Sequence, residues 1–313
     1  MKHMKFLSFF LGVTFSIVAC SSNNEIIPVP DVDPDGDDGT TEVEFAKGAD
    51  IGWVTEYESK GYNFYNAKGE QRECTALMKE LGLNAIRIRV WVDPSKHGNW
   101  CNTADVVEKA KRAKELGMDV MIDFHYSDWW ADPAQQNKPA SWVGKNLANL
   151  KSAIKDHTVS VLQALKTIGV IPKWVQVGNE IRPGMLWDED VALSGASYNV
   201  TEKDLKDAPA SATDKVVYPM NWANLGAFVT TGYDAVKSVF PDAIVIVHLD
   251  NGWDSGLFTW FFDELKKNGG KWDMIGMSLY PYWSRDAKEG YSSADAVITD
   301  CISNIKALST KYN

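Results

Sequence analysis

Short apolar runs alternate with amphipathic stretches along this 313-residue sequence from residue 45 onward. We expect strands over six ranges: 46–52, 85–91, 119–125, 174–179, 243–249 and 274–280. Between them lie helical patterns such as that of residues 103–117, in which Val106, Ala110 and Ala113 share one face. Alternation of strands and helices over this length predicts a parallel sheet covered by helices.

Nearly every predicted strand ends in polar side chains that are suited to chemistry. In chain order these are Asp50, Arg87, Arg89, His125, Asp128, Asn179, Glu180, His248, Asp250 and Tyr280. Catalytic groups of a (β/α)8 barrel lie at the carboxyl ends of its strands, so this repeated pattern favours that fold. No glycine-rich phosphate loop follows the first strand, which counts against a dinucleotide-binding, doubly wound sheet.

Residues 174–178 read as a buried strand that runs directly into Asn179 and Glu180. A buried carboxylate without a partner is costly. Glu180 therefore either pairs with a cation such as Arg87 or lies at the mouth of a barrel, where it can act on a substrate. The polar strand ends favour the second interpretation.

The first 44 residues predict export rather than folded structure. Lys2 and Lys5 precede an apolar run, residues 6–19, that ends at Cys20. This pattern is typical of a bacterial lipoprotein signal: residues 1–19 would be removed and Cys20 lipidated, which would hold the protein at the cell envelope or cell surface. The alternative is an ordinary secretory signal with an incidental cysteine, which would give a secreted protein.

Residues 20–44 are polar, acidic and rich in proline and glycine, which predicts a flexible linker to a folded domain over 45–313. An EF-hand calcium pattern is present there at Asp31, Asp33, Asp35, Gly36 and Glu42. No flanking helices are predicted and Pro34 suits such a loop poorly, so we interpret the segment as a linker. No apolar run after residue 20 approaches the ~20 residues of a membrane span, so the lipid anchor is the only membrane attachment that we expect.

The composition limits the classes of partner that this chain is expected to bind. The formal net charge of −10 counts against nucleic acid as a partner. The 13 tryptophans exceed what an aliphatic barrel core needs, so we expect several rings to line a cleft. After Cys20, Cys74, Cys101 and Cys301 remain, and an odd number in an exported chain permits at most one internal disulfide.

Asn-Glu after a fourth strand is the mark of a large clan of retaining glycoside hydrolases with barrel folds. Six motifs, one of which contains this Asn-Glu pair, narrow the resemblance: GADIGW (48–53), NAIRIRVWVDP (84–94), DFHYSDWWADP (123–133), VGNEIRPGMLW (177–187), HLDNGW (248–253) and SLYPYW (278–283). Together, residues 45–313 resemble glycoside hydrolase family 53, the endo-β-1,4-galactanases that act on galactan and arabinogalactan side chains of pectin. The resemblance implies a (β/α)8 TIM barrel and a polysaccharide substrate, without a cofactor.

The resemblance also implies residue roles. Glu180 would be the general acid/base of a retaining mechanism, in which a second carboxylate ~5–5.5 Å away is the nucleophile. Asn179 would hydrogen-bond the sugar 2-hydroxyl. Arg87 would hold the nucleophile ionised, and Tyr280 would donate a hydrogen bond to it.

A further set of residues is expected to bind sugars: Asp50, Arg89, Trp91, His125, Asp128, Trp129, Trp187, His248, Asp250 and Trp253. Alternatives remain for some of them, since the histidines could be structural, the tryptophans could pack in the core, and Asp50 could cap the barrel. We expect no metal site at His125, Asp128 and His248, because carboxylate pairs perform this chemistry without a metal.

The sequence departs from the family pattern at the catalytic nucleophile. It is a glutamate at the end of a seventh strand, and only six strands are predicted. The glutamates after Glu180 are Glu189, Glu202, Glu264 and Glu289, and none ends an apolar strand. We therefore expect an incomplete barrel of about six βα units from a longer galactanase. The alternatives are a surface glycan-binding lipoprotein without catalysis, or another clan member such as a β-mannanase or endoglucanase.

Overall fold

The computed structural model describes residues 45–133, 135–187, 222–282, 284 and 293–312, all within one compact unit, Phe45–Asn313. The predicted signal segment, Cys20 and the linker lie outside the described residues. So do Glu189, Glu202 and Glu289.

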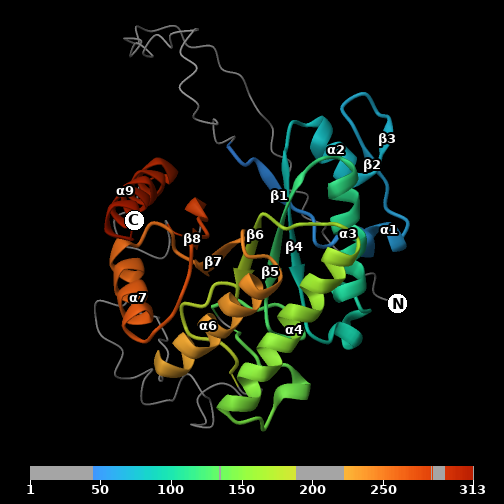
Figure 1. Cartoon of the computed structure of the whole chain (residues 1–313). Coiled ribbons are helices and arrows are strands. Elements are labelled where there is room, and N and C mark those ends of the chain that lie inside the picture. The colour runs from blue at the N-terminus through green and yellow to red at the C-terminus, as the bar shows by residue number, and fades with distance from the viewer. Residues whose placement is uncertain (1–44, 134, 188–221, 283, 285–292, 313) are drawn as a thin grey trace, which may run out of the picture. The chain divides into compact units, whose positions relative to one another are not determined.

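Six parallel strands form one curved sheet in the order β1-β4-β5-β6-β7-β8, an open and incomplete (β/α)8 barrel (Figure 1). They are β1 (Gly48–Asp50), β4 (Ala85–Val90), β5 (Asp119–Phe124), β6 (Trp174–Val177), β7 (Ile244–Leu249) and β8 (Met274–Met277). Each predicted strand is present and is shorter than expected at one or both ends. The predicted fold class is confirmed.

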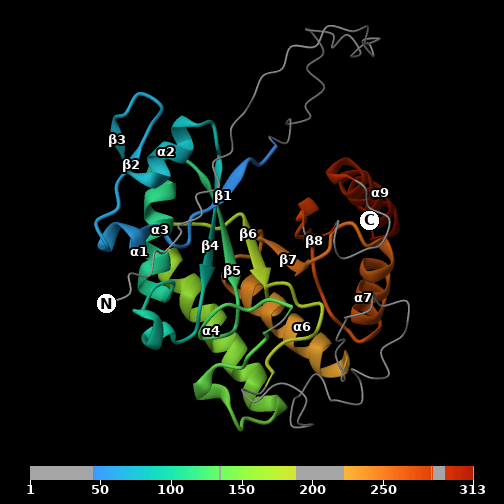
Figure 2. The same ribbon diagram turned by 180° about the vertical axis from the view of Figure 1, so that it is seen from behind.

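Helices cover one face of this sheet, as the views from the two sides show (Figures 1 and 2). They are α1 (Val54–Ser59), α2 (Cys74–Glu80), α3 (Thr103–Glu115), α4 (Leu147–Thr167), α6 (Trp222–Val239), α7 (Ser255–Lys267) and α9 (Ala294–Tyr312). Short 3-10 turns lie at Pro94–His97 and Ala140–Trp142. Several helices begin at a side-chain cap: Asn102 accepts from the N–H of Asp105, and Asn146 from that of Asn149.

The period-two alternation of side chains divides each strand between core and site. Ile86 and Ile88 of β4, like Val175 and Val177 of β6, are fully buried in the core. On the same strands, Arg87 and Gln176 point to the other side and line a cavity. The inner face of the sheet is therefore mixed in character, with Arg87 and Gln176 in register beside the apolar Met121 and Ile246.

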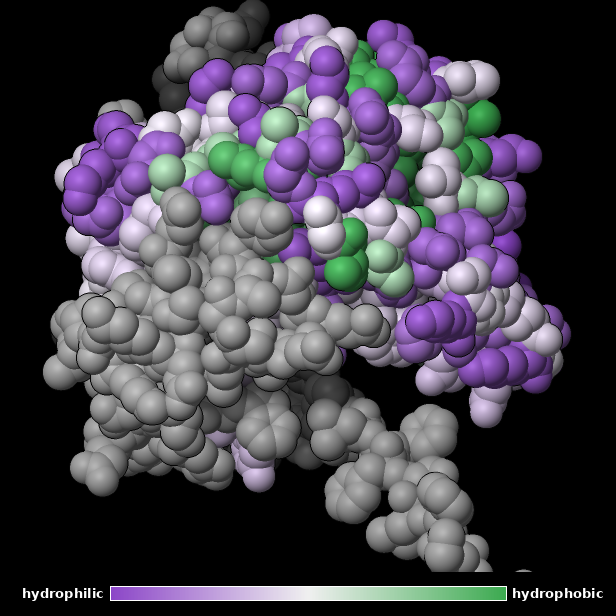
Figure 3. Space-filling model, turned by 90° about the horizontal axis from the view of Figure 1, so that it is seen from below, coloured by the Kyte–Doolittle hydropathy of each residue, from purple (hydrophilic) through white to green (hydrophobic). Residues whose placement is uncertain are grey.

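Several features were not predicted or were left open by the sequence. An antiparallel hairpin of β2 (Phe64–Tyr65) and β3 (Gln71–Arg72) precedes α2, and its strands are too short to give a periodic signal. Cys74, Cys101 and Cys301 are all buried and unpaired with each other. Within the described ranges, no helix combines the length and apolarity needed to cross a bilayer. Hydrophilic residues cover much of the described surface in the view from below (Figure 3).

Candidate active site

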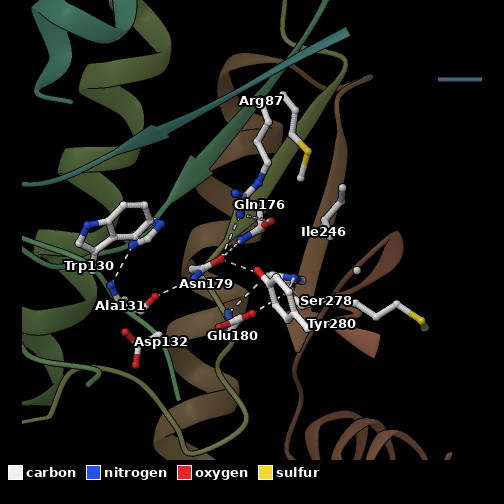
Figure 4. A pocket seen from close by; sticks show the side chains of 15 residues that line it. Arg87, Trp130, Ala131, Asp132, Gln176, Asn179, Glu180, Ile246, Ser278 and Tyr280 are labelled. Atoms are coloured by element: carbon white, nitrogen blue, oxygen red, sulfur yellow. Dashed lines mark hydrogen bonds between the residues drawn. The ribbon is translucent and has the colours of Figure 1, made fainter. Parts of the chain in front are cut away.

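A cavity of about 520 Å³ opens where the strands end (Figure 4). Residues from β4 to β8 and the segments that follow these strands line it: Arg87, Met121, His125, Trp130, Ala131, Asp132, Gln176, Asn179, Glu180, Ile246, His248, Gly276, Met277, Ser278 and Tyr280. The acidic residues in this set are Asp132 and Glu180. The structure thus brings together much of the predicted strand-end set.

Glu180 leaves the end of β6 on an unusual backbone. Its φ is +50°, and that of Gly178, two residues earlier, is +80°. A side chain in the left-handed region is disfavoured, and such strain often accompanies functional sites. The turn is held from outside the strand, because Nε2 of Gln136 donates to the carbonyls of Asn179 (2.8 Å) and Glu180 (3.2 Å).

The carboxyl group of Glu180 is only partly buried, and Ser278 Oγ lies 2.5 Å from its Oε1. Burial raises the pKa of Glu180, and the nearby charges of Asp250 and Asp132 add to that effect, while Ser278 and Arg87 oppose it without reversing it. A carboxyl that keeps its proton to higher pH than usual is suited to general acid catalysis.

Arg87 links polar side chains from several strands on the inner face of the sheet. Its Nη1 lies 2.7 Å from Asp50 Oδ2, and its Nη2 lies 2.7 Å from Asp123 Oδ2. Nη2 also donates to the side-chain oxygens of Gln176 (3.2 Å) and Asn179 (3.0 Å). The alternative in which Arg87 pairs with Glu180 is therefore not what the hydrogen bonds show: its direct carboxylate partners are Asp50 and Asp123.

The amide of Asn179 has a defined orientation. Its Nδ2 donates to the carbonyl of Ala131 (2.6 Å), while its Oδ1 accepts from Arg87 and from Gln176 Nε2 (3.1 Å). Asn179 is buried, and it is held in place at both ends of its side chain. A pre-oriented amide beside Glu180 is what a sugar-binding role requires.

Asp123 is the buried anion beneath the site, and the sequence analysis did not single it out. It is fully buried and accepts from Gln176 Nε2 at 2.5 Å and lies 2.9 Å from His125 Nε2. Burial raises the pKa of Asp123, but Arg87 and His125 outweigh burial, so the pKa is lowered overall. The signal that could have revealed Asp123 is its register: it faces the same side as Arg87 and Gln176 on neighbouring strands.

The two predicted histidines line the cavity but use their ring nitrogens within the protein. His125 Nδ1 accepts from the N–H of Ala131 (2.9 Å), while its Nε2 faces Asp123. His248 contacts the N–H of Glu180 through Nδ1 (3.3 Å) and Ser278 through Nε2 (2.9 Å). Both contact sets support the alternative of structural histidines.

The predicted aspartates differ in their surroundings. Asp128 accepts from the N–H groups of Asp93 (2.9 Å) and Ala140 (2.8 Å), so it joins two loops and is not part of the cavity lining. Asp250 forms a buried ion pair with Arg182 (2.8 Å). Burial raises the pKa of Asp250, and Arg182 only partly compensates.

Three of the tryptophans expected to bind sugar are almost fully buried. Trp91, Trp187 and Trp253 are only 2%, 5% and 3% exposed, and a ring must expose a face to stack on a sugar. Trp129 is 36% exposed and stacks on His97 at 3.7 Å between ring centroids. Trp130, which the sequence analysis did not single out, is 39% exposed and lines the cavity.

Arg89 lies beneath Trp130 rather than in the cavity. It is 4% exposed, and its guanidinium carbon is 4.1 Å from the centre of the Trp130 ring. Arg89 therefore supports an aromatic wall of the site instead of contacting a ligand. Tyr280 is 58% exposed and lines the cavity after β8.

The described residues contain no group of three or more His, Cys, Asp or Glu side chains placed to hold a metal ion. Near the cavity, Asp50 and Asp123 pair with Arg87, Asp250 pairs with Arg182, and Glu180 accepts from the hydroxyl of Ser278.

Comparison with known proteins gives a consistent result. The model of glycosyl hydrolase family 53 matches residues 46–312. An arabinogalactan endo-β-1,4-galactanase of Thermothelomyces thermophilus is 34% identical over 247 residues, which cover 77% of this chain and 65% of that protein.

Two solved structures are similar in fold and sequence. One belongs to a study of two fungal β-1,4-galactanases, with 30% identity, a TM-score of 0.68, and coverage of 85% of this chain and 70% of that one. The other is the family 53 catalytic domain of Ignisphaera aggregans, with 30% identity, a TM-score of 0.69, and coverage of 86% and 66%. The chain spans 60–65% of the length of the first curated relatives that it matches.

Proposed function

Because the chain belongs to glycosyl hydrolase family 53, we propose that it takes part in endo-hydrolysis of β-1,4-galactosidic bonds in galactan or arabinogalactan side chains of pectin, with Glu180 as general acid/base. The observation that carries the proposal is the carboxyl of Glu180 at the end of β6, inside the cavity, with its pKa raised by burial. The relatives named galactanases support the choice of substrate.

In the proposed retaining mechanism, protonated Glu180 donates to the glycosidic oxygen as the bond to the anomeric carbon breaks. A carboxylate nucleophile attacks that carbon and forms a covalent glycosyl intermediate. The ionised Glu180 then removes a proton from water, which attacks the same carbon and releases the nucleophile. Asn179 is pre-oriented to bind the sugar 2-hydroxyl beside Glu180.

The nucleophile is a separate part of the proposal. Among the described residues, no glutamate other than Glu180 follows a strand of the six-stranded sheet. The resemblance assigns the nucleophile to a seventh strand, which Tyr280 and the Arg87 network would adjoin. The residues described here thus supply the acid/base half of the mechanism.

Binding of a polysaccharide is supported by the exposed rings beside the cavity. Trp130 presents a partly open ring backed by Arg89, and Trp129 lies next to it in the chain. Aromatic faces of this kind suit the apolar faces of pyranose rings. Together with Asn179 and Asp132 they give the cavity both stacking and hydrogen-bonding groups.

The test compares β-1,4-galactan, mannan and cellulose, with release of reducing ends as the measure of hydrolysis and retardation in polysaccharide-containing gels as the measure of binding. We expect preference for galactan, and internal cleavage visible as a rapid fall in viscosity. Glu180→Gln is the matched control, since it keeps the shape of the side chain. Retardation in galactan without hydrolysis would favour the glycan-binding alternative, and preference for mannan or cellulose would reject the galactan assignment.

We also propose export with lipidation at Cys20, on the strength of the sequence pattern of residues 1–20 alone. Metabolic labelling with a radioactive fatty acid tests this directly. We expect label in the wild-type protein and none in Cys20→Ala. A secreted, unlabelled wild-type protein would favour the ordinary secretory signal.

A further inference from the structure

Glu180, His248 and Ser278 form a closed ring of hydrogen bonds that starts and ends on Glu180. The main-chain N–H of Glu180 lies 3.3 Å from His248 Nδ1. His248 Nε2 lies 2.9 Å from Ser278 Oγ, and Ser278 Oγ lies 2.5 Å from Glu180 Oε1. The three residues come from the ends of β6, β7 and β8.

The direction of each hydrogen bond in the ring follows from the first. An amide N–H can only donate, so His248 Nδ1 accepts from Glu180 and the neutral imidazole carries its proton on Nε2. That N–H donates to Ser278 Oγ. The single hydroxyl proton of Ser278 is then left to donate to Glu180 Oε1.

The other neutral tautomer of His248, with the proton on Nδ1, reverses these hydrogen bonds and leaves polar groups without partners. His248 Nδ1 is also 3.1 Å from Asn179 Oδ1, to which a proton on Nδ1 could be donated. That oxygen already lies within hydrogen-bond distance of two other donors, Arg87 Nη2 (3.0 Å) and Gln176 Nε2 (3.1 Å), which compete with His248 for it. A proton on Nδ1 would also leave the N–H of Glu180 without its acceptor and turn the Ser278 hydroxyl away from the carboxylate.

We propose that His248 and Ser278 are positioning residues that fix the acidic proton of Glu180 on Oε2, an inference that rests on the assignment of Glu180 as the acid/base. Oε1 accepts from Ser278 whether or not the carboxyl is protonated. Among the described residues Oε2 has no hydrogen-bond partner, so it is the oxygen that can donate to a glycosidic oxygen. His248, expected from the sequence to bind sugar, instead acts through Ser278.

The electrostatic setting is consistent with this ring. His248 is 9% exposed, and burial, with a contribution from Arg87, lowers its pKa to about 4, so the imidazole remains neutral at neutral pH. The charged groups that act on the Glu180 carboxyl are Asp250, Asp132 and Arg87, and none of them belongs to the ring. The ring itself carries no charge at neutral pH, so it acts on Glu180 through its hydrogen bonds and its share of the burial, not through a charge.

The first experiment uses the wild-type chain with 15N-labelled histidine side chains and needs no enzymatic activity. Long-range proton–nitrogen NMR distinguishes the two neutral tautomers. We expect His248 to be neutral with its proton on Nε2 from pH 6 to pH 9, and a proton on Nδ1 would overturn the proposal.

The second experiment measures the pKa of Glu180 by 13C NMR of its carboxyl. Ser278→Ala removes the donor that favours the ionised form, so the midpoint should move to higher pH. Ser278→Thr, which retains a hydroxyl, should restore it, and the control Ser238→Ala on α6 should leave it unchanged. An unchanged midpoint in folded Ser278→Ala would contradict the role of Ser278.

Hydrolysis of galactan supplies a separate measurement. Loss of a hydrogen bond to a charged group should lower kcat about tenfold or more in Ser278→Ala and His248→Phe, with little change in KM. If wild-type protein shows the expected tautomer and Glu180 titration but no galactan hydrolysis, the proposed function fails while the ring stands. If hydrolysis is present and the variants retain wild-type kcat, the ring has no positioning role.

Discussion

Replacing Arg87 by methionine tests whether its ion pairs with the partly exposed Asp50 and the fully buried Asp123 stabilise the inner face of the sheet. The change keeps most of the apolar stem but removes the guanidinium that lies 2.7 Å from a carboxylate oxygen of both Asp50 and Asp123. Asp123 is fully buried, so the variant leaves an interior anion with His125 and Gln176 as its remaining polar partners. Breaking a buried pair in this way costs about 3–5 kcal/mol.

We expect the free energy of unfolding at pH 7 to fall by about 3–5 kcal/mol, measured by urea titration with tryptophan fluorescence. The matched control is Arg72→Met. Arg72 also contacts two carboxylates, those of Glu70 and Glu80, but its side chain is 38% exposed. Because exposed pairs contribute little, the control should lose no more than about 1 kcal/mol.

The loss should depend on pH in a direction fixed by Asp123. The pKa of Asp123 is lowered in the folded wild type, so its ionisation stabilises the fold above its unfolded pKa of ~3.9, and this contribution is lost as the pH falls through the lower folded-state value. Without Arg87, burial dominates and the folded-state pKa should rise. The destabilisation should then shrink as the pH falls toward 4. A loss below about 1 kcal/mol at pH 7, or one that stays constant down to pH 4, would refute the reasoning.

Three further predictions concern single side chains. In an active preparation, Glu180→Gln should lower galactan hydrolysis by about 10²–10⁴-fold. The first step on an activated aryl galactobioside, which releases the phenol, should survive because that leaving group needs no proton. Galactan hydrolysis within about threefold of wild type would exclude the acid/base role. Burial lowers the pKa of His157 to about 4, so the unfolded state binds more protons between about pH 4 and 6.5 and stability rises with pH there. Removing this titration in His157→Phe should make that slope smaller, and an unchanged slope in urea titrations would contradict it. Gly178→Ala places a Cβ 2.5 Å from the nearest side chain at φ +80°, so its Tm should fall by several degrees, whereas Gly256→Ala, with 3.4 Å to the nearest atom, should keep its Tm within about a degree.

The sheet could be predicted because its strands are apolar runs that end in polar residues. Both signals are local in the sequence, and they place Glu180 and Asn179 correctly at the end of β6. The hairpin β2–β3 could not be predicted, because two-residue strands carry no period.

The exposed fraction of an aromatic ring depends on tertiary packing, so it could not be predicted from the local sequence. Trp91 and Trp130 belong to neighbouring motifs of the same chemistry, yet Trp91 is 2% exposed and Trp130 is 39% exposed. The difference comes from packing, because Trp91 lies among Trp129, Trp130 and Arg89. Ser278 was missed for a related reason: only the register of β7 and β8 brings its hydroxyl between His248 and Glu180.

Because the backbone of Glu180 is left-handed, selection for thermal stability and selection for activity favour different residues at position 180. A glycine there would remove a backbone cost of about 1–2 kcal/mol. A library screened only for heat tolerance should therefore become enriched in glycine at this position. Those variants would have lost the carboxyl that the proposed chemistry needs. Directed evolution of this protein should therefore hold codon 180 fixed and seek thermal tolerance at positions outside the cavity.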